Sequence, residues 1–197
     1  TRQELEFRRA FFYPPFCELA AILVSSANRE RAEEAARELG AALGSRKLVL
    51  ITDDIVARYY DEWTHATANA RALGARSSDA GIRLRCEARL IFPAGEEHKT
   101  RETWVQLSDQ MLSQGLDRQT AIVALGGGVV GDLAGFVAAT YLRGVPYAQV
   151  PTTLLAMLDA SVGGKVGVDT SLGKNLIGAF HPPAVVVADP LTLLTLP

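Results

Sequence analysis

The sequence has little of what marks secreted, metal-binding or nucleic-acid-binding proteins. Among its 197 residues only Cys17 and Cys86 are cysteines, and their wide separation fits no metal or redox motif. No signal-peptide pattern opens the sequence, so we expect reduced thiols and a cytoplasmic protein. A net charge of −2 provides no basic surface, which argues against nucleic acid or an anionic membrane as a partner.

Paired histidines and hydrolase motifs are missing too. His65, His98 and His181 are far apart without an H-x-x-x-H spacing, so we expect no metal site within this chain. There is no G-x-S-x-G motif, which leaves a hydrolase without support. Residues 121–142 are apolar enough to suggest a membrane span. However, a charge such as Asp132 inside a span costs about 3 kcal/mol or more, so we expect a buried strand, a turn and a helix there.

Short apolar runs alternate with helix-like stretches along the rest of the chain. The runs are RKLVLIT (46–52), ARLIF (88–92), TAIVAL, VPYAQV (145–150) and AVVVA (184–188). Between the second and third runs, Trp104, Leu107 and Met111 have helical spacing, and Gly115 is placed to end that helix. This alternation predicts an α/β fold with a mostly parallel, Rossmann-like sheet and helices on both faces.

Polar or glycine-rich residues follow the predicted strands. They are Asp53-Asp54, PAGEEHK (93–99), GGGVVGD, PTT (151–153) and Asp189. Ligands of open parallel sheets bind outside the carboxyl ends of the strands. We therefore expect these residues to line one crevice.

A glycine-rich turn follows the third run. Gly126, Gly128 and Gly131 have the G-x-G-x-x-G spacing, which lets the backbone approach a pyrophosphate at a helix start. The acid that usually binds the ribose about 20 residues later is missing, so that contact must come from elsewhere. We expect Asp132 in the first turn of the following helix, where it faces hydroxyl groups or serves only as a helix-start acid.

Several charged residues lie on a small, apolar background between Pro151 and Pro182, and a charge there must be paired, solvated or part of a site. They are Asp159, Lys165, Asp169 and Lys174, with the polar Asn175 beside them. The alternative is an exposed loop with internal Asp–Lys pairs. Elsewhere, Glu96 and Lys99 could form a simple surface pair, and Arg143 could merely complement a helix dipole.

Together these motifs resemble the 3-dehydroquinate synthase family. The matching words are PAGEEHKT, LGGGVVGDLAGFVAATYLRGV, QVPTTLLAMLDASVGGKVGVD, GKNLIGAFHPP and DPLTLLTLP, which run from about Arg46 to Pro197. Iron-dependent alcohol dehydrogenases differ from this chain after the PTT. Other sugar phosphate cyclases, of the deoxyinosose or valiolone type, share parts of the pattern and remain an alternative, as does a non-catalytic binding module.

The resemblance implies roles for individual residues. The NAD contacts it implies are Asp53, Glu96, Lys99, Gly127, Gly128, Val129, Val130, Gly131, Asp132, Thr152, Thr153, Lys165, Lys174, Thr192, Leu193 and Thr195. The residues it places at the substrate are Asp159, Lys165 and Asn175. Arg143 resembles an arginine that reaches the phosphate of a neighbouring subunit, which implies a homodimer.

The implied reaction converts 3-deoxy-D-arabino-heptulosonate 7-phosphate, a phosphorylated sugar acid, to 3-dehydroquinate and phosphate in the shikimate pathway. NAD transiently oxidises a ring hydroxyl, phosphate leaves, and an aldol step closes the carbocycle. The family also uses a divalent metal, zinc or cobalt, whose glutamate ligand follows soon after the position of Pro197 and whose two histidine ligands lie in a later helical domain. We therefore expect this polypeptide by itself not to turn over substrate.

Residues 1–44 do not resemble the start of that family. They weakly resemble part of the C-terminal region of the bacterial primosomal replication-restart helicase, without any helicase motif. We expect an atypical N-terminal segment of one strand and one helix over residues 1–44, and an NAD-binding α/β domain over residues 45–197, with the junction at Gly44-Ser45.

Overall fold

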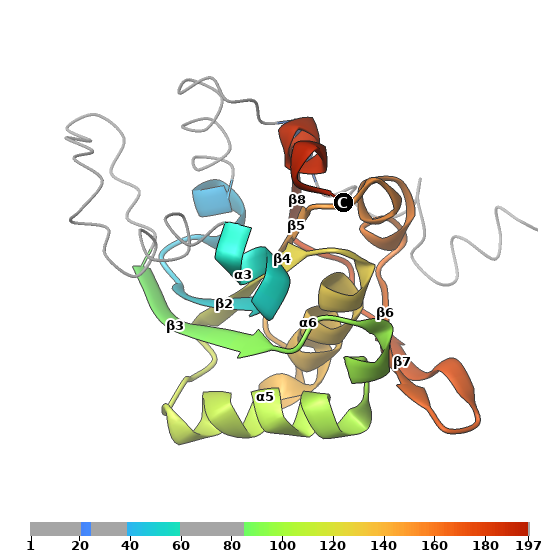
Figure 1. Ribbon diagram of the computed structural model, residues 1–197. Coiled ribbons are helices and arrows are strands. Elements are labelled where there is room, and N and C mark those ends of the chain that lie inside the picture. The colour runs from blue at the N-terminus through green and yellow to red at the C-terminus, as the bar shows by residue number, and fades with distance from the viewer. Residues whose placement is uncertain (1–20, 25–38, 60–84, 197) are drawn as a thin grey trace, which may run out of the picture.

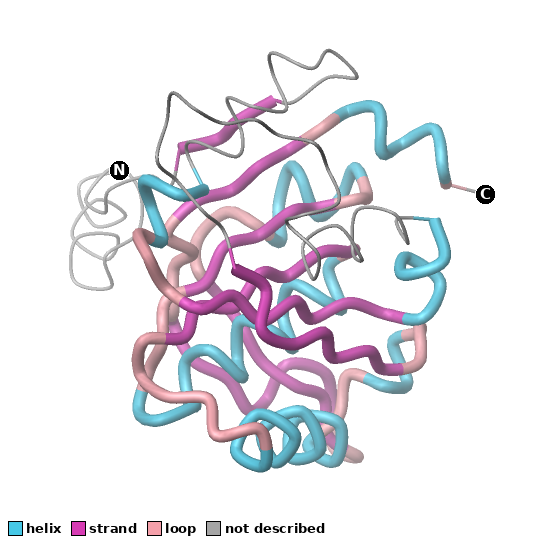
Figure 2. The backbone as a smooth tube through the Cα atoms, turned by 90° about the vertical axis from the view of Figure 1, so that its left-hand side faces the viewer, coloured by secondary structure: helices cyan, strands magenta, loops and turns pink. Residues whose placement is uncertain are grey.

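A six-stranded sheet forms the centre of the molecule (Figures 1 and 2). The computed structural model describes residues 21–24, 39–59 and 85–196. The strands are β1 (Ala21–Val24), β2 (Lys47–Asp53), β3 (Arg85–Phe92), β4 (Thr120–Gly126), β5 (Tyr147–Pro151) and β8 (Val185–Ala188). Their order in the sheet is β1-β8-β5-β4-β2-β3, and every neighbouring pair is parallel. The predicted α/β fold with a parallel sheet is confirmed.

The N-terminal segment contributes to this sheet. Strand β1 pairs with β8 in parallel, and the helix that ends at Leu43 places Leu39 and Leu43 in the core beneath β2 and β4. The remainder of residues 1–44, including Cys17, lies outside the described residues, as does His65. The proposed junction at Gly44 is a helix end, where Gly44 has a φ of 64° and its N–H donates to the Gly40 carbonyl.

Helices cover both faces of the sheet. The main ones are α5 (Arg101–Ser113) and α6 (Gly128–Thr140), which lie together on one face (Figure 1). Helix α3 (Asp54–Tyr59) follows β2, and short helical turns η1 (Glu96–His98), η2 (Tyr141–Arg143), η3 (Ala156–Ala160) and η4 (Pro190–Thr195) occupy the connections. The stretch 121–142 is thus a strand, a turn and a helix, as expected. In the described parts, no helix is long and apolar enough to cross a membrane.

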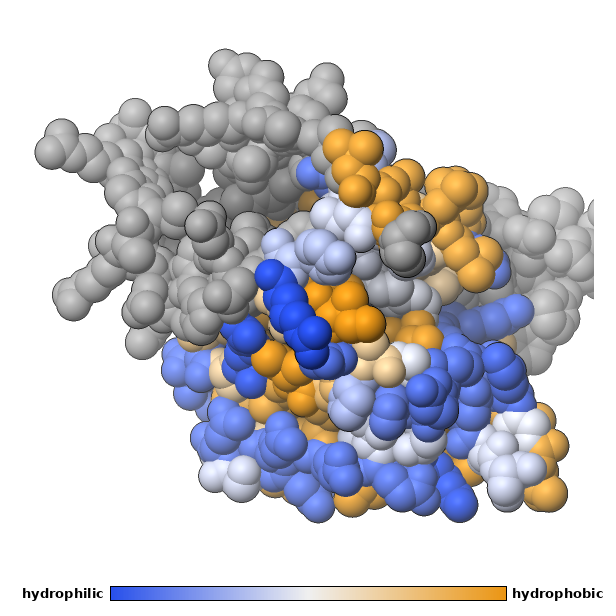
Figure 3. Space-filling view, viewed as in Figure 1, coloured by the Kyte–Doolittle hydropathy of each residue, from blue (hydrophilic) through white to orange (hydrophobic). Residues whose placement is uncertain are grey.

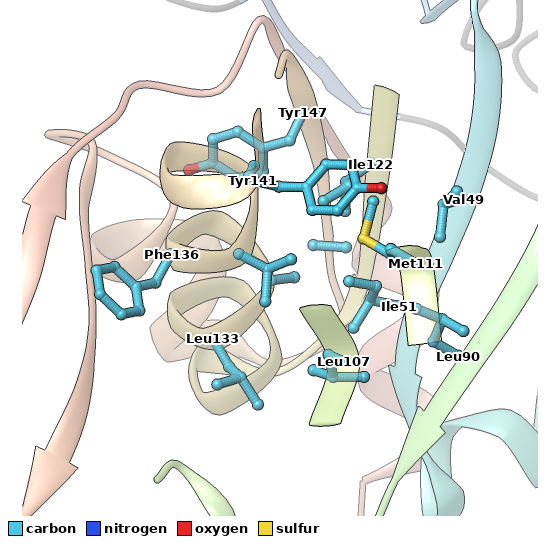
Figure 4. Close-up of a cluster of buried hydrophobic side chains, with 14 of the residues drawn as sticks. Val49, Ile51, Leu90, Leu107, Met111, Ile122, Leu133, Phe136, Tyr141 and Tyr147 are labelled. Atoms are coloured by element: carbon cyan, nitrogen blue, oxygen red, sulfur yellow. The ribbon is translucent and has the colours of Figure 1, made fainter. Parts of the chain in front are cut away.

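The larger hydrophobic core lies between α5, α6 and the sheet (Figure 4). Leu107 and Met111 of α5 are buried against it, while Trp104 packs at its edge and donates through Nε1 to the Thr140 hydroxyl at 2.9 Å. Gly115 ends α5 in a left-handed conformation, and the Leu116 N–H then bonds the Met111 carbonyl at 3.2 Å. The helical spacing and the glycine stop were therefore both correctly predicted.

A separate antiparallel hairpin packs on the outer side of α6. It consists of β6 (Lys165–Thr170) and β7 (Gly173–Phe180), in the stretch whose alternative interpretation was an exposed loop. Gly135 of α6 makes this contact possible, because a Cβ there would collide with the Val166 side chain and approach the Tyr147 hydroxyl at 3.1 Å. These two strands have no strand pattern in the sequence and were not predicted.

Candidate functional site

The parallel topology brings the strand ends to one edge. Asp53 at the end of β2 lies opposite Phe92 of β3, Thr52 lies opposite Leu125 of β4, and Gly126 lies opposite Pro151 of β5. The loops that follow β2, β3, β4 and β5 therefore start side by side. The register therefore places the predicted loops at one edge of the sheet, and a single crevice lined by them stays a prediction.

The glycine turn leaves the start of α6 open. Gly127 is the N-cap, and no side chain caps the helix. A Cβ at Gly126 would collide with Val130, whereas one at Gly128 would meet only the Ala160 Cβ at 3.6 Å. Gly131 lies against the buried Gln149 amide, so it serves close packing between helix and strand. The first N–H groups of α6, from Gly128 to Val130, can therefore receive an anion.

Asp53 and Asp54 connect the ends of β2 and β3. Asp53 Oδ1 accepts a bond from the Val56 N–H at 2.7 Å and so caps α3. Burial raises the pKa of Asp53, although the N–H groups of Val56 and Ile55 oppose that shift. Asp54 Oδ1 accepts from the Ala94 N–H at 2.8 Å, which ties the β3 loop to α3. Asp53 thus has a structural role in addition to the NAD contact that the resemblance implies, and a carboxylate can accept bonds from both partners.

The predicted threonines lie at the ends of the neighbouring strands. Thr152 is buried and its N–H bonds the Gly126 carbonyl at 2.9 Å, while the Thr153 methyl lies 3.2 Å from the position of a Cβ on Gly127. In η4, the Thr192 hydroxyl donates to the Asp189 carbonyl and the Thr195 hydroxyl to the Thr192 carbonyl, with Leu193 between them. Thr152 and Thr153 therefore adjoin the glycine turn directly.

A cluster of charged residues surrounds the Lys99 ammonium group, and we call it the Lys99 cluster. Its members are Glu96, Lys99, Asp132, Asp169, Lys174 and Asn175. Lys99 Nζ lies 2.9 Å from Asn175 Oδ1, 3.3 Å from Asp132 Oδ2 and 3.5 Å from Asp169 Oδ1. The cluster thereby joins the β3 loop, α6 and the hairpin.

Glu96 completes the cluster at its exposed side. Its Oε1 lies 3.3 Å from Lys99 Nζ and 3.0 Å from Lys174 Nζ. Only 4% of Lys99 is exposed, so the interpretation of Glu96 and Lys99 as a simple surface pair is wrong. Asp169 and Lys174 likewise find their partners outside their own segment, so their pairs are not internal to a loop.

The charges of the cluster shift one another's pKa values. Burial acts to lower the pKa of Lys99, but the carboxylates of Asp132, Glu96 and Asp169 outweigh it and the pKa rises. Burial raises the pKa of Asp132 despite the opposing charge of Lys99. The hydrogen bond from Lys174 lowers the pKa of Glu96. Lys99 therefore stays protonated at neutral pH.

One local prediction is wrong. Asp132 was expected in the first turn of its helix, but α6 begins at Gly128, so Asp132 is the fifth helical residue and lies in the second turn. The partial charge at a helix start fades within one turn, so it does not explain the position of this acid. Asp132 is held by the Lys99 ammonium instead.

The remaining predicted residues are Asp159, Lys165 and Arg143. Asp159 is in η3, directly before Ala160, which contacts the space above Gly128. Lys165 pairs with Phe180 at the open end of the hairpin, whereas Asn175 lies close to the turn at the other end. Arg143 is exposed at the far end of α6, which is about 20 Å long.

In the part of the chain that the structure describes, no group of three or more His, Cys, Asp or Glu side chains could hold a metal ion. An exposed apolar patch lies on η4, on η3 and on the residues directly before η3, and it is seen as the orange area at the upper right of Figure 3. Its residues are Leu154, Leu155, Leu158 and Leu194, each more than half exposed.

Asp169 belongs to the Lys99 cluster, although neither its motif nor the family resemblance assigns it to the site. Its position on an apolar background was noted, but its partners Lys99 and Asn175 could not be foreseen because they come from another loop and from across the hairpin turn. The signal that could have found it is the charge itself, since a carboxylate among valines and glycines needs a cation.

Comparison with protein families identifies a match over more than half of the chain. The family described as 3-dehydroquinate synthase N-terminal matches residues 89–197. The 3-dehydroquinate synthase of Symbiobacterium thermophilum is 53% identical over 153 residues, which are 78% of this chain and 39% of that protein. The chain spans about two fifths of the length of the curated relatives it matches.

Solved structures of related enzymes have the same architecture. The 2-epi-5-epi-valiolone synthase of Streptomyces hygroscopicus, with NAD+ and Zn2+ bound, is 31% identical with a TM-score of 0.70, and the match covers 90% of this chain and 44% of that one. A 2-deoxy-scyllo-inosose synthase in complex with carbaglucose-6-phosphate, NAD+ and Co2+ is 29% identical with a TM-score of 0.68, covering 88% and 44% of the two chains.

Proposed function

The chain belongs to the 3-dehydroquinate synthase family, and on this premise we propose that it supplies the NAD-binding part of such an enzyme. The complete enzyme would convert 3-deoxy-D-arabino-heptulosonate 7-phosphate to 3-dehydroquinate and phosphate. The single observation that carries the proposal is the open start of α6 at the edge where β2, β4 and β5 end. Identities near 50% to 3-dehydroquinate synthases, against about 30% to the valiolone and inosose enzymes, favour this product over theirs.

The residues present fit a dinucleotide. The backbone from Gly127 to Gly131 would receive the pyrophosphate, since no side chain caps it and Gly128 leaves the approach open. Asp53 would bind the adenosine ribose. Thr152 and Thr153 adjoin the turn, and Glu96, Lys99, Asp132 and Lys174 would complete the NAD site from the Lys99 cluster.

When bound, NAD supplies reversible hydride transfer at a ring hydroxyl. The chain itself contributes position and charge: Lys99 Nζ holds its proton and orients Asp132 and Asn175. Asp159, Lys165 and Asn175 would face the phosphorylated sugar acid. The described residues do not offer a ligand set for the divalent metal of the family.

Arg143 would act at the phosphate of a neighbouring subunit. Its side chain is exposed beyond the C-terminal end of α6, the end opposite to Gly128, so it cannot serve the crevice of its own chain without a large change. This supports a homodimer, for which light scattering should give twice the mass of 21.1 kDa. We place the protein in the cytoplasm and expect neither nucleic acid nor a membrane as a partner, in keeping with its slight net charge and the free thiol of Cys86.

A calorimetric titration of NAD tests the proposed function. Dissociation constants of about 1 mM or tighter are expected, and Gly128→Val should weaken binding at least about tenfold because its side chain obstructs the anion path. Asp53→Ala should weaken it too. Asp117→Ala is the control, since Asp117 is an exposed carboxylate that also accepts a backbone N–H, away from the crevice. A folded chain without any heat of binding would contradict the proposal.

A further inference from the structure

Asp169 holds two parts of the molecule together through its backbone and its side chain. Its N–H donates to the Lys99 carbonyl at 2.7 Å, which joins the hairpin to the β3 loop. Its Oδ1 accepts from the Asn175 N–H at 2.8 Å and lies 3.5 Å from Lys99 Nζ. The Asp169 side chain is 16% exposed, whereas Asn175 is exposed to solvent. No role was assigned to this residue by the sequence motifs.

The bond to Asn175 fixes an unusual conformation. Asn175 has a φ of 55°, a left-handed backbone that asparagine adopts more readily than other residues with a side chain but that is still uncommon outside glycine. Because Asp169 accepts its N–H, the Asn175 amide oxygen is directed at Lys99 Nζ, 2.9 Å away. Asp169, Asn175 and Lys99 thus form a closed ring of three contacts.

We propose that Asp169 is a positioning residue that sets the orientation of Lys99 and Asn175 for ligand binding. The inference rests on the proposed function, because the ligand whose binding it affects is NAD. Without the Asp169 carboxylate, Asn175 loses the acceptor that holds its backbone. Lys99 Nζ then keeps Asp132 and Glu96 on the other side and shifts toward them. Asp169 itself need not touch the nucleotide.

The geometric part is tested without nucleotide, by hydrogen exchange of the Asn175 amide in NMR spectra. Asp169→Ala should speed this exchange at least about tenfold because the acceptor is lost. Asp169→Asn retains an acceptor oxygen and should stay within about threefold of the wild type. Asp117→Ala should leave it unchanged. Unaltered exchange of Asn175 in Asp169→Ala would overturn the proposal, as would a tenfold acceleration in Asp169→Asn.

The functional part is tested by titrating NAD into the same variants. Asp169→Ala should weaken binding about tenfold and Asp169→Asn less than about threefold. In a Lys99→Gln background Asp169→Ala should have little further effect on NAD binding, because Lys99 is the residue of the ring that belongs to the proposed NAD site, whereas Asn175 would face the sugar acid. Equal losses in both backgrounds would overturn the proposal.

Two outcomes need separate controls. If wild-type chain binds no NAD, the proposed function fails, while the exchange of Asn175 still decides whether Asp169 fixes this conformation. If Asp169→Ala does not fold, the double variant with Asn175→Gly replaces it, since glycine adopts a φ of 55° at little cost. Restored folding supports the positioning role, and failure of the double variant to fold contradicts it.

Discussion

At the scale of the residue, Lys99 shows how a buried cation is tolerated. Three carboxylates and one amide oxygen lie within 3.5 Å of its Nζ, so the desolvation of the ammonium group is compensated on several sides. Sequence spacing could suggest Glu96 as a partner, since it lies one helical turn away. Asp132 and Asn175 could not be foreseen as its partners, because only the packed fold brings these distant residues to the same atom.

Replacing Lys99 should destabilise the protein more than replacing an exposed lysine. In Lys99→Met, Asp132 and Asp169 lose a buried cation, and the free energy of unfolding should fall by about 3 kcal/mol or more. Lys47→Met is the matched control. Lys47 pairs with Asp117 at 3.7 Å with both side chains about half exposed, so its loss should cost less than about 1 kcal/mol. Urea denaturation of both variants checks the difference, and similar losses would contradict this account of Lys99.

The stabilisation by Lys99 should depend on pH in a defined direction. Its carboxylate neighbours, of which Asp132 has the largest effect, raise its pKa above 10.5 in spite of burial. A group whose pKa is higher in the folded state stabilises fully below its unfolded pKa and loses this effect above its folded pKa. The difference in unfolding free energy between wild type and Lys99→Met should therefore be constant from about pH 7 to 10 and shrink at higher pH. A difference that grows above pH 10 would contradict the claim that folding raises the pKa of Lys99.

At the scale of the element, strands buried in the sheet were predicted and the hairpin was not. Strand β4 is buried along its whole length and reads as a continuous apolar run, which is what a central parallel strand requires. Strand β7 is exposed at nearly every position, so it has no buried face to give an alternating pattern. It folds because β6 packs on α6 and because the Lys99 cluster holds the turn end of the hairpin.

Gly135 should be essential for the docking of the hairpin. Gly135→Val would force a side chain into Val166 and the Tyr147 ring, and overpacking of this kind costs about 1–3 kcal/mol. Thermal unfolding followed by circular dichroism should show a lower Tm. Gly128→Ala is the control, because its Cβ meets only Ala160 at an ordinary contact distance, and its Tm should stay at or above that of the wild type. An unchanged Tm in Gly135→Val would contradict close packing of β6 against α6 at this position.

At the scale of the whole molecule, parallel pairing explains why residues far apart in sequence share one edge. Once five apolar runs are assigned to one parallel sheet, their carboxyl ends must face the same way, and the polar loops follow. This step was predictable from the sequence. The order of the strands and the joining of β1 to β8 were not, because they depend on side-chain packing between distant segments.

NMR spectra of the chain recorded during addition of NAD test the central claim most directly. The account predicts that the backbone N–H signals of Gly127, Gly128 and Val129 shift most, with smaller shifts at Asp53 and Lys99, and that Gly115 at the end of α5 stays unchanged. Shifts confined to residues away from the carboxyl ends of the strands would contradict it, as would saturation with NAD without any change at the start of α6.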